Sequence, residues 1–138
     1  MIELLPAVRN DRAGGGRFGD PRGERLHEGT DLRALAGQPV ALKRPMHFNR
    51  IGMCYGGDDH YKLVEMRLAE YSDILVQFFY VDPRKGMKVH DLYQPGFVIG
   101  YVQDIAGRYP DSGMQNHIHV EVIRNGKNVD PEHWIRTL

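Results

Sequence analysis

The chain has 138 residues and a mass of 15.8 kDa; 18 Lys and Arg balance 18 Asp and Glu, and 41% of the residues are hydrophobic. The formal net charge is therefore zero. Proteins that bind nucleic-acid phosphates or anionic lipid surfaces normally carry an excess of basic residues, so we expect no nucleic-acid partner. The length suits one domain with a hydrophobic core, and 16 Gly with 8 Pro favour turns and short strands over long helices.

The N-terminal end of the chain differs in composition from the rest. It lacks the basic segment and long apolar run of an export signal, and no stretch of the sequence is long enough to span a membrane. Residues 10–23 are rich in Gly, Asp and Arg and poor in apolar side chains, which predicts a surface loop. We therefore divide the chain into a lead-in segment, residues 1–17, and one domain, residues 18–138.

Short apolar segments separated by turn residues follow in chain order. Alternating or β-branched patterns predict strands at residues 40–42, 61–68, 74–81, 97–102 and 117–123. Helical patterns are confined to a turn around residues 32–35 and a segment at 131–135. The fold class is therefore predicted as all-β, a mostly antiparallel barrel or sandwich with little helix.

Two short motifs carry residue types that bind metals: His27-x-x-x-Asp31 and His117-x-His119. Residues i and i+2 of a strand share a face, so His117 and His119 project together, while the residues that alternate with them face the core. Cys54 is the only cysteine, which excludes a site built from several thiolates. Two imidazoles and one carboxylate with an open fourth position is the usual composition of a catalytic zinc site.

Glycines and turn residues surround these motifs in a characteristic order. The surrounding segments are 18–23, 36–40, 94–101 and 125–131. In this order and spacing the sequence resembles the lysostaphin-type zinc metalloendopeptidases of bacterial cell walls, over about residues 18–134. The resemblance implies a β fold with a substrate groove, one bound Zn²⁺ ion and hydrolysis of peptide bonds in peptidoglycan.

The resemblance also implies roles for particular residues. His27, Asp31 and His119 would bind the zinc ion, and His117 would be the general base. His117 would keep a ring nitrogen free to accept a proton because it does not bind the metal. Glu121 lies on the same strand face and could orient one of the imidazoles as a hydrogen-bond acceptor.

The sequence departs from the family pattern in one central strand. The family has Tyr-x-His there, and counting back from Gly96 gives Phe79, Tyr80 and Val81, so Val81 stands where a histidine helps to stabilise the oxyanion. A regular strand would leave the Tyr80 hydroxyl at the surface, so Tyr80 could take this role only through a bulge. His90, expected in an exposed loop, is the other candidate.

Four further residues lie in segments that the family pattern places around the groove, where they could contact a peptide: Tyr55, Tyr93, Tyr109 and Asn116. The expected protein is a monomeric zinc endopeptidase whose partner is peptidoglycan peptide. Without an export signal it would suit a bacteriophage lysin, carried in the virion or released at lysis. A mature fragment of a longer secreted protein is the alternative.

Two other functions stay open from the sequence. Val81 favours a catalytically weak or inactive relative that keeps zinc and binds wall peptide or a partner hydrolase. A copper redox protein can also place His-x-His on a strand, but it would need more histidine ligands than the motifs supply, or Cys54 beside them.

Overall fold

The computed structural model describes residues 8–11, 14–22 and 25–134, and the structural statements below concern these residues. Most of this part of the chain forms antiparallel strands, as predicted. The helical segments in it are two 3₁₀ turns, η1 (Ala106–Arg108) and η2 (Pro131–His133), and no described helix is long and apolar enough to cross a membrane.

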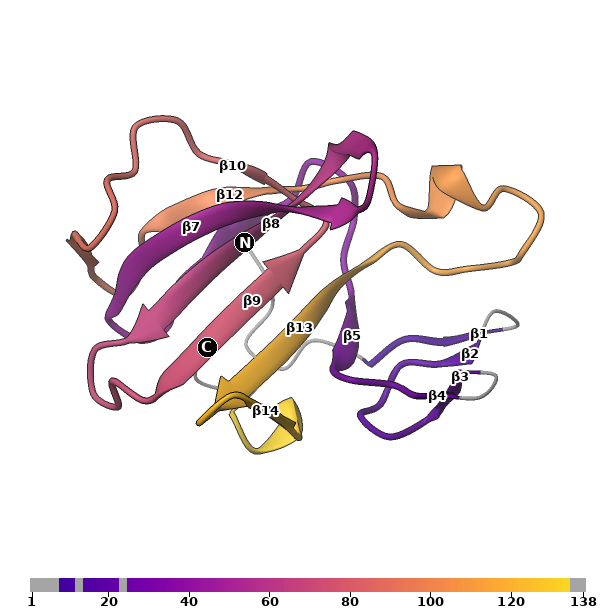
Figure 1. Ribbon diagram of the computed structural model, residues 1–138. Coiled ribbons are helices and arrows are strands. Elements are labelled where there is room, and N and C mark those ends of the chain that lie inside the picture. Colours follow the sequence, from indigo (N-terminus) through magenta and orange to yellow (C-terminus); the bar gives the residue numbers. More distant parts are fainter. Residues whose placement is uncertain (1–7, 12–13, 23–24, 135–138) are drawn as a thin grey trace.

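A curled, seven-stranded antiparallel sheet forms the body of the molecule (Figure 1). Its order is β11 (Leu92–Tyr93), β7 (Met46–Tyr55), β8 (Asp58–Leu68), β9 (Ile74–Phe79), β13 (His117–Arg124) and β14 (Lys127–Val129). The seventh strand, β5 (Thr30–Arg33), pairs with the first half of β13 on the edge that β14 also uses. β13 is therefore bordered on both sides over most of its length.

A smaller sheet supplies the other side of the hydrophobic core. It contains β10 (Val81–Pro83), β12 (Val98–Val102) and β6 (Pro39–Ala41), in that order. Side chains of both sheets form one buried cluster that includes Val64, Val76 and Ile99. Ile118 and Val120 of β13 also belong to this cluster, each 1% exposed, which leaves the histidines that alternate with them on the opposite face.

The segment before β5 contains more strand than the predicted surface loop. β1 (Asn10–Asp11) pairs with β2 (Gly14–Gly15), and β3 (Pro21–Arg22) pairs with β4 (Arg25–Leu26), beside β5 in Figure 1. Val8 bridges to Leu32 of β5. The lead-in segment therefore contacts the domain more closely than its composition suggested; residues 1–7, 12–13 and 23–24 lie outside the described residues.

Three local predictions differ from the structure. The helical turn expected at residues 32–35 is wrong, because β5 covers Thr30–Arg33 and is paired with β13. β7 was not predicted, because register shifts at Phe48/Arg50 and Met53/Tyr55 break its alternation. The strand expected at 74–81 is interrupted at Tyr80, whose φ of 68° separates β9 from β10.

Candidate metal centre

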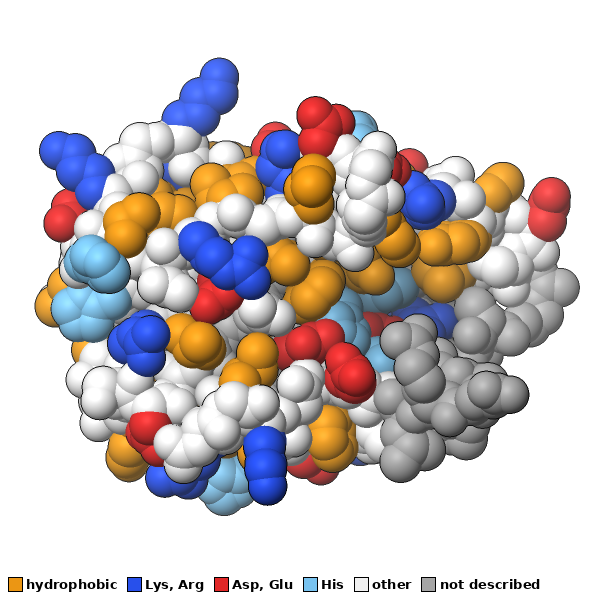
Figure 2. Space-filling view, viewed as in Figure 1, with side chains coloured by type: hydrophobic (Ala, Val, Ile, Leu, Met, Phe, Trp, Pro, Cys, Tyr) orange, Lys and Arg blue, Asp and Glu red, His pale blue; other side chains and the backbone are white. Residues whose placement is uncertain are grey.

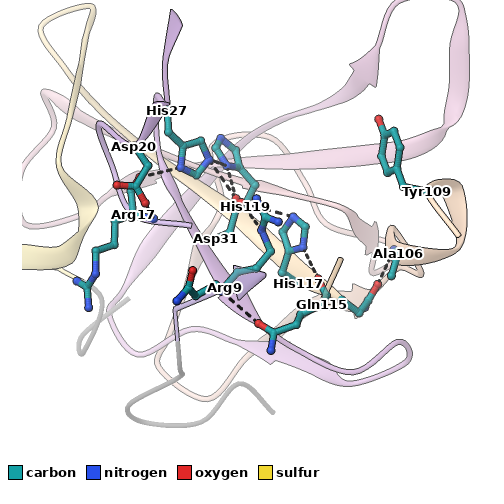
Figure 3. Close-up of polar contacts among 12 residues, drawn as sticks. Arg9, Arg17, Asp20, His27, Asp31, Ala106, Tyr109, Gln115, His117 and His119 are labelled. Carbon is teal, nitrogen blue, oxygen red and sulfur yellow. Dashed lines mark hydrogen bonds and ion pairs between the residues drawn. The ribbon is translucent and has the colours of Figure 1, made fainter. Parts of the chain in front are cut away.

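Three candidate ligands converge where β5 pairs with β13 (Figure 3). Asp31 is the direct cross-strand partner of His119, so both side chains leave the sheet on the same face. His27 comes from the loop between β4 and β5. Gly29 allows that loop to lie against β13, since a Cβ at this position would lie 2.3 Å from the Val120 carbonyl oxygen. The folding of β5 onto β13 thus assembles all three side chains.

The donor atoms of the three ligands form a small triangle. His27 Nε2 lies 3.1 Å from His119 Nδ1, and Asp31 Oδ1 lies 2.7 Å from His119 Nδ1 and 3.3 Å from His27 Nε2. Ligands about 2.0–2.2 Å from a tetrahedral zinc ion lie about 3.3–3.6 Å apart, so a slight expansion accommodates such an ion. Two imidazole nitrogens and one carboxylate oxygen also match the donors that zinc prefers, and the three residues form a possible metal-binding group.

The contacts behind the ligands orient both imidazoles. His27 Nδ1 lies 2.9 Å from the carbonyl oxygen of Arg17, so this nitrogen donates and Nε2 offers its lone pair to the centre. His119 Nε2 lies 2.9 Å from Glu121 Oε2, and the other Glu121 oxygen accepts from Asn128. With Nε2 bonded to Glu121, His119 Nδ1 faces the other candidate ligands.

The surroundings of the ligands favour a negatively charged Asp31 and a positively charged His119. Burial alone would raise the pKa of the Asp31 carboxyl, but its close contacts with His119 and His27 hold that pKa well below its ordinary value. Burial opposes a charged His119, yet hydrogen bonds to Asp31 and Glu121 raise the pKa of His119 to about 9. A metal ion that binds at neutral pH must therefore displace a proton from His119.

His117 lies beside the ligands and has a different protonation. Its Nδ1 donates to the carbonyl oxygen of Gln115 at 2.8 Å, which leaves Nε2 as an acceptor, 3.7 Å from Asp31 Oδ2. The side chain is buried and lines the same pocket as the three ligands. Burial lowers the pKa of His117, and the nearby Asp31 carboxylate offsets this only in part. A neutral imidazole with a free nitrogen in the pocket can accept a proton.

Tyr80 occupies the pocket through a break in the strand. Its positive φ lies between β9 and β10, and its ring stands edge-on to that of His117, with 5.5 Å between centroids. The expected position of this side chain at the surface is wrong, because the break between the two strands turns Tyr80 into the pocket. Burial raises the pKa of Tyr80 to about 12, so its hydroxyl stays a donor. Val81 is fully buried in the core.

Two of the predicted groove residues extend this pocket. The Tyr55 ring stacks on the Tyr80 ring with 6.4 Å between centroids, and the Tyr55 hydroxyl lies 3.1 Å from the Tyr109 hydroxyl. The Arg108 guanidinium lies 4.0 Å from the centre of the Tyr55 ring and bonds to Asp58 at 2.6 Å. Figure 2 shows histidine side chains in a hollow of this face, with acidic and hydrophobic side chains at its border. Tyr55, Tyr80 and Tyr109 therefore give one wall of the pocket aromatic rings and hydroxyl groups.

The structure does not bring three other predicted residues to this pocket. His90 is exposed in the loop before β11, away from the ligands. Tyr93 packs on Phe97 with a centroid distance of 4.3 Å. Asn116 bonds through its side chain to three backbone groups, among them the Ala34 carbonyl, and so supports the loop that leads into β13. Tyr93 and Asn116 therefore have packing and loop contacts outside this pocket, and their contact with a peptide stays a prediction.

Several residues that line the pocket were not predicted from the sequence, among them Arg9 and Cys54. Arg9 is 2% exposed, and its Nε bonds to Asp31 Oδ2 at 2.9 Å; in a polar, glycine-rich segment it gave no sign of burial. Cys54 also lines the pocket, but burial raises the pKa of its thiol to about 11, so it stays protonated. Among the described residues the possible metal-binding group does not include Cys54, which argues against a copper–thiolate site.

Comparisons with known proteins give structural matches alone. A scan against protein-family models and a search of curated proteins find no match. The catalytic domain of lysostaphin, an antimicrobial peptidase of Staphylococcus simulans, is 20% identical over 89% of this chain and 90% of its own, with a TM-score of 0.65. A mutant catalytic domain of EnpA, a prophage-encoded M23 protein of Enterococcus faecalis, is 19% identical over 95% and 97% of the two chains, with a TM-score of 0.64.

A third match has a longer chain. A putative M23 peptidase of Pseudomonas aeruginosa is 19% identical over 99% of this chain and 56% of its own, with a TM-score of 0.59. The fold is thus that of lysostaphin-type M23 peptidase catalytic domains, and the resemblance found in the motifs is confirmed at the level of structure. This chain shares a β fold with those domains. In this chain the fold brings the possible metal ligands His27, Asp31 and His119 together in one pocket.

Proposed function

We propose that this chain is a zinc-dependent endopeptidase that hydrolyses peptide bonds in bacterial peptidoglycan. The observation that carries the proposal is the convergence of His27, Asp31 and His119 beside a neutral His117 in one pocket. Histidine and carboxylate ligands leave a fourth position for water or substrate, which distinguishes a catalytic zinc site from a closed structural one. The peptidase fold of the solved relatives supports the same reaction class.

The three ligands, His117 and Tyr80 have distinct tasks in this reaction. A zinc ion on the three ligands would supply Lewis-acid polarisation of the scissile carbonyl and lower the pKa of water. His117 accepts the proton of the attacking water through Nε2, because its Nδ1 is held by Gln115. Tyr80 donates its hydroxyl proton to the carbonyl oxygen as negative charge develops there, the task of the histidine that Val81 replaces.

The pocket wall and the relatives support the proposed substrate and location. Tyr55 and Tyr109 present hydroxyls and ring faces to an extended peptide, and neither demands a strongly charged ligand. Peptidoglycan stem or bridge peptides have this mixed character. Lysostaphin is described as an antimicrobial peptidase, and EnpA is encoded by a prophage, which supports a wall-directed enzyme released by a phage. We propose that it acts as a monomer.

The proposal is tested by zinc content and by release of new amino groups from purified sacculi. Wild type should bind one zinc ion and cleave, His119→Ala should lose zinc and cleavage, and His117→Ala should lose turnover while it keeps zinc. His60→Ala is a matched control, because His60 is exposed and outside the pocket. Stoichiometric zinc without cleavage of sacculi from several wall types would refute the catalytic claim.

A non-catalytic, zinc-containing relative that binds wall peptide is the second candidate, and Val81 is the observation that favours it. The His117→Ala comparison separates the two functions. A binding module would show no turnover in either form, and its affinity for sacculi would persist. An enzyme would show turnover that depends on His117.

A further inference from the structure

A buried arginine lies next to the candidate metal ligands. Only 2% of Arg9 is exposed, and it lines the pocket that contains His117 (Figure 3). Its Nε donates to Asp31 Oδ2 at 2.9 Å, and the two side chains are 3% and 4% exposed. Burial of a guanidinium is costly unless an opposite charge binds it, so the Asp31 carboxylate is what allows Arg9 to lie there.

The backbone around Arg9 is shaped for this contact. The Arg9 N–H donates to the Asp31 carbonyl at 2.8 Å, and the Asp31 N–H donates to the Gly16 carbonyl at 2.6 Å. The Gly16 N–H in turn donates to the Arg9 carbonyl at 2.7 Å. A Cβ on Gly16 would lie 2.7 Å from that same carbonyl oxygen, so only glycine permits the approach. Asp31 is therefore held through its backbone and its side chain by one segment.

The two oxygens of the Asp31 carboxylate face different neighbours. Oδ1 lies 2.7 Å from His119 Nδ1 and 3.3 Å from His27 Nε2, whereas Oδ2 lies 2.9 Å from Arg9 Nε. A charge-assisted hydrogen bond to Oδ2 directs that oxygen away from the ligand nitrogens. A second bond from Oδ2 to an ion would therefore compete with the hydrogen bond that the same oxygen accepts from Arg9.

We infer that Arg9 is a positioning residue that keeps Asp31 a one-oxygen metal ligand. The inference rests on the metal site of the proposed function. Two imidazoles and one carboxylate oxygen leave the fourth position of a tetrahedral ion open, whereas a second carboxylate oxygen would occupy it. Arg9 thereby preserves the place where water and substrate must bind.

Cobalt(II) in place of zinc provides the test, because four-coordinate cobalt absorbs visible light several-fold more strongly than five- or six-coordinate cobalt. The variants are Arg9→Met, Arg9→Lys and the control Arg124→Met, whose arginine is exposed and bonds to Asp73 at 3.1 Å. At equal bound cobalt, Arg9→Met should lose absorption several-fold, while the control keeps the wild-type spectrum. Arg9→Lys retains a cationic donor and should recover most of the absorption.

An unchanged cobalt spectrum in Arg9→Met would overturn the inference, as would a lysine variant that absorbs as weakly as the methionine variant. Metal affinity would not test the role of Arg9, because two effects on it oppose each other. Loss of the Arg9 charge would raise the affinity for a cation, and release of Asp31 would lower it. Failure of wild type to bind cobalt or zinc would instead refute the metal site, and so the proposed function.

Circular dichroism and thermal unfolding establish whether Arg9→Met folds. If it does not, X-ray absorption of the zinc-loaded wild type decides the question without any variant. One carboxylate oxygen at bonding distance would support the inference, and two would overturn it.

Discussion

Replacement of Tyr80 by Phe removes one hydroxyl from the pocket and keeps the ring that packs against His117. The ring centroids of these residues are 5.5 Å apart, and Tyr55 keeps its hydroxyl contact with Tyr109 at 3.1 Å when the Tyr80 hydroxyl is absent. The fold should therefore lose no more than about 1 kcal/mol, the value of one neutral hydrogen bond. Any large effect on turnover must come from the hydroxyl itself.

The expected loss in kcat is about 10²–10³-fold, or about 3–4 kcal/mol, which is typical when one donor to a developing oxyanion is removed. KM should change little, because the hydrogen bond strengthens only in the transition state. The assay follows release of amino groups from soluble peptidoglycan fragments at saturating zinc. Tyr93→Phe is the control, since the Tyr93 hydroxyl accepts from the Lys88 N–H outside the pocket.

Two results would refute this reasoning. If Tyr80→Phe, loaded with zinc, retains kcat within about threefold of wild type, which corresponds to less than about 1 kcal/mol, the hydroxyl does not stabilise the transition state. A rise in KM with unchanged kcat would assign Tyr80 to ground-state binding of the peptide instead.

Three further predictions concern the strand, the loop and the protonation of the centre. Val81→His should not restore the activity that the family's histidine supports, because Val81 is fully buried in the core and does not face the pocket. The substitution should lower the free energy of unfolding by about 2–4 kcal/mol in denaturant. Unchanged stability with raised activity would contradict the assignment of Tyr80. Gly29→Ala should weaken zinc binding at least roughly tenfold in chelator competition, because a Cβ 2.3 Å from the Val120 carbonyl moves the loop that bears His27, whereas Gly56→Ala, with open space around it, should not. Since the pKa of His119 is raised to about 9, apparent zinc affinity should fall roughly tenfold for each unit that the pH drops from 9 to 7, and a flat profile would show that no proton is displaced.

Strand positions followed from sequence wherever alternation was regular. The spacing of His117 and His119 predicted a shared face because β13 is an undistorted strand, and Ile118 lies in the core as expected. The sequence did not predict β7, because its two register shifts interrupt the alternation of buried and exposed residues. The sequence around 32–35 predicts a helical turn instead of a strand, because pairing between residues more than 80 positions apart leaves no local signal.

The metal motifs made His27, Asp31, His117 and His119 candidates from the sequence. The resemblance to the lysostaphin-type family implied which three would bind the ion and which would be the general base. Sequence also showed that a histidine of the family pattern is absent at Val81. Only the tertiary structure showed that Tyr80 lines the pocket, since the backbone at Tyr80 adopts a positive φ that no single-sequence pattern predicts. Tertiary structure likewise decided that Arg9, from a segment that looked like a surface loop, lies buried against Asp31, because long-range backbone hydrogen bonds and the absence of a side chain at Gly16 bring the two together.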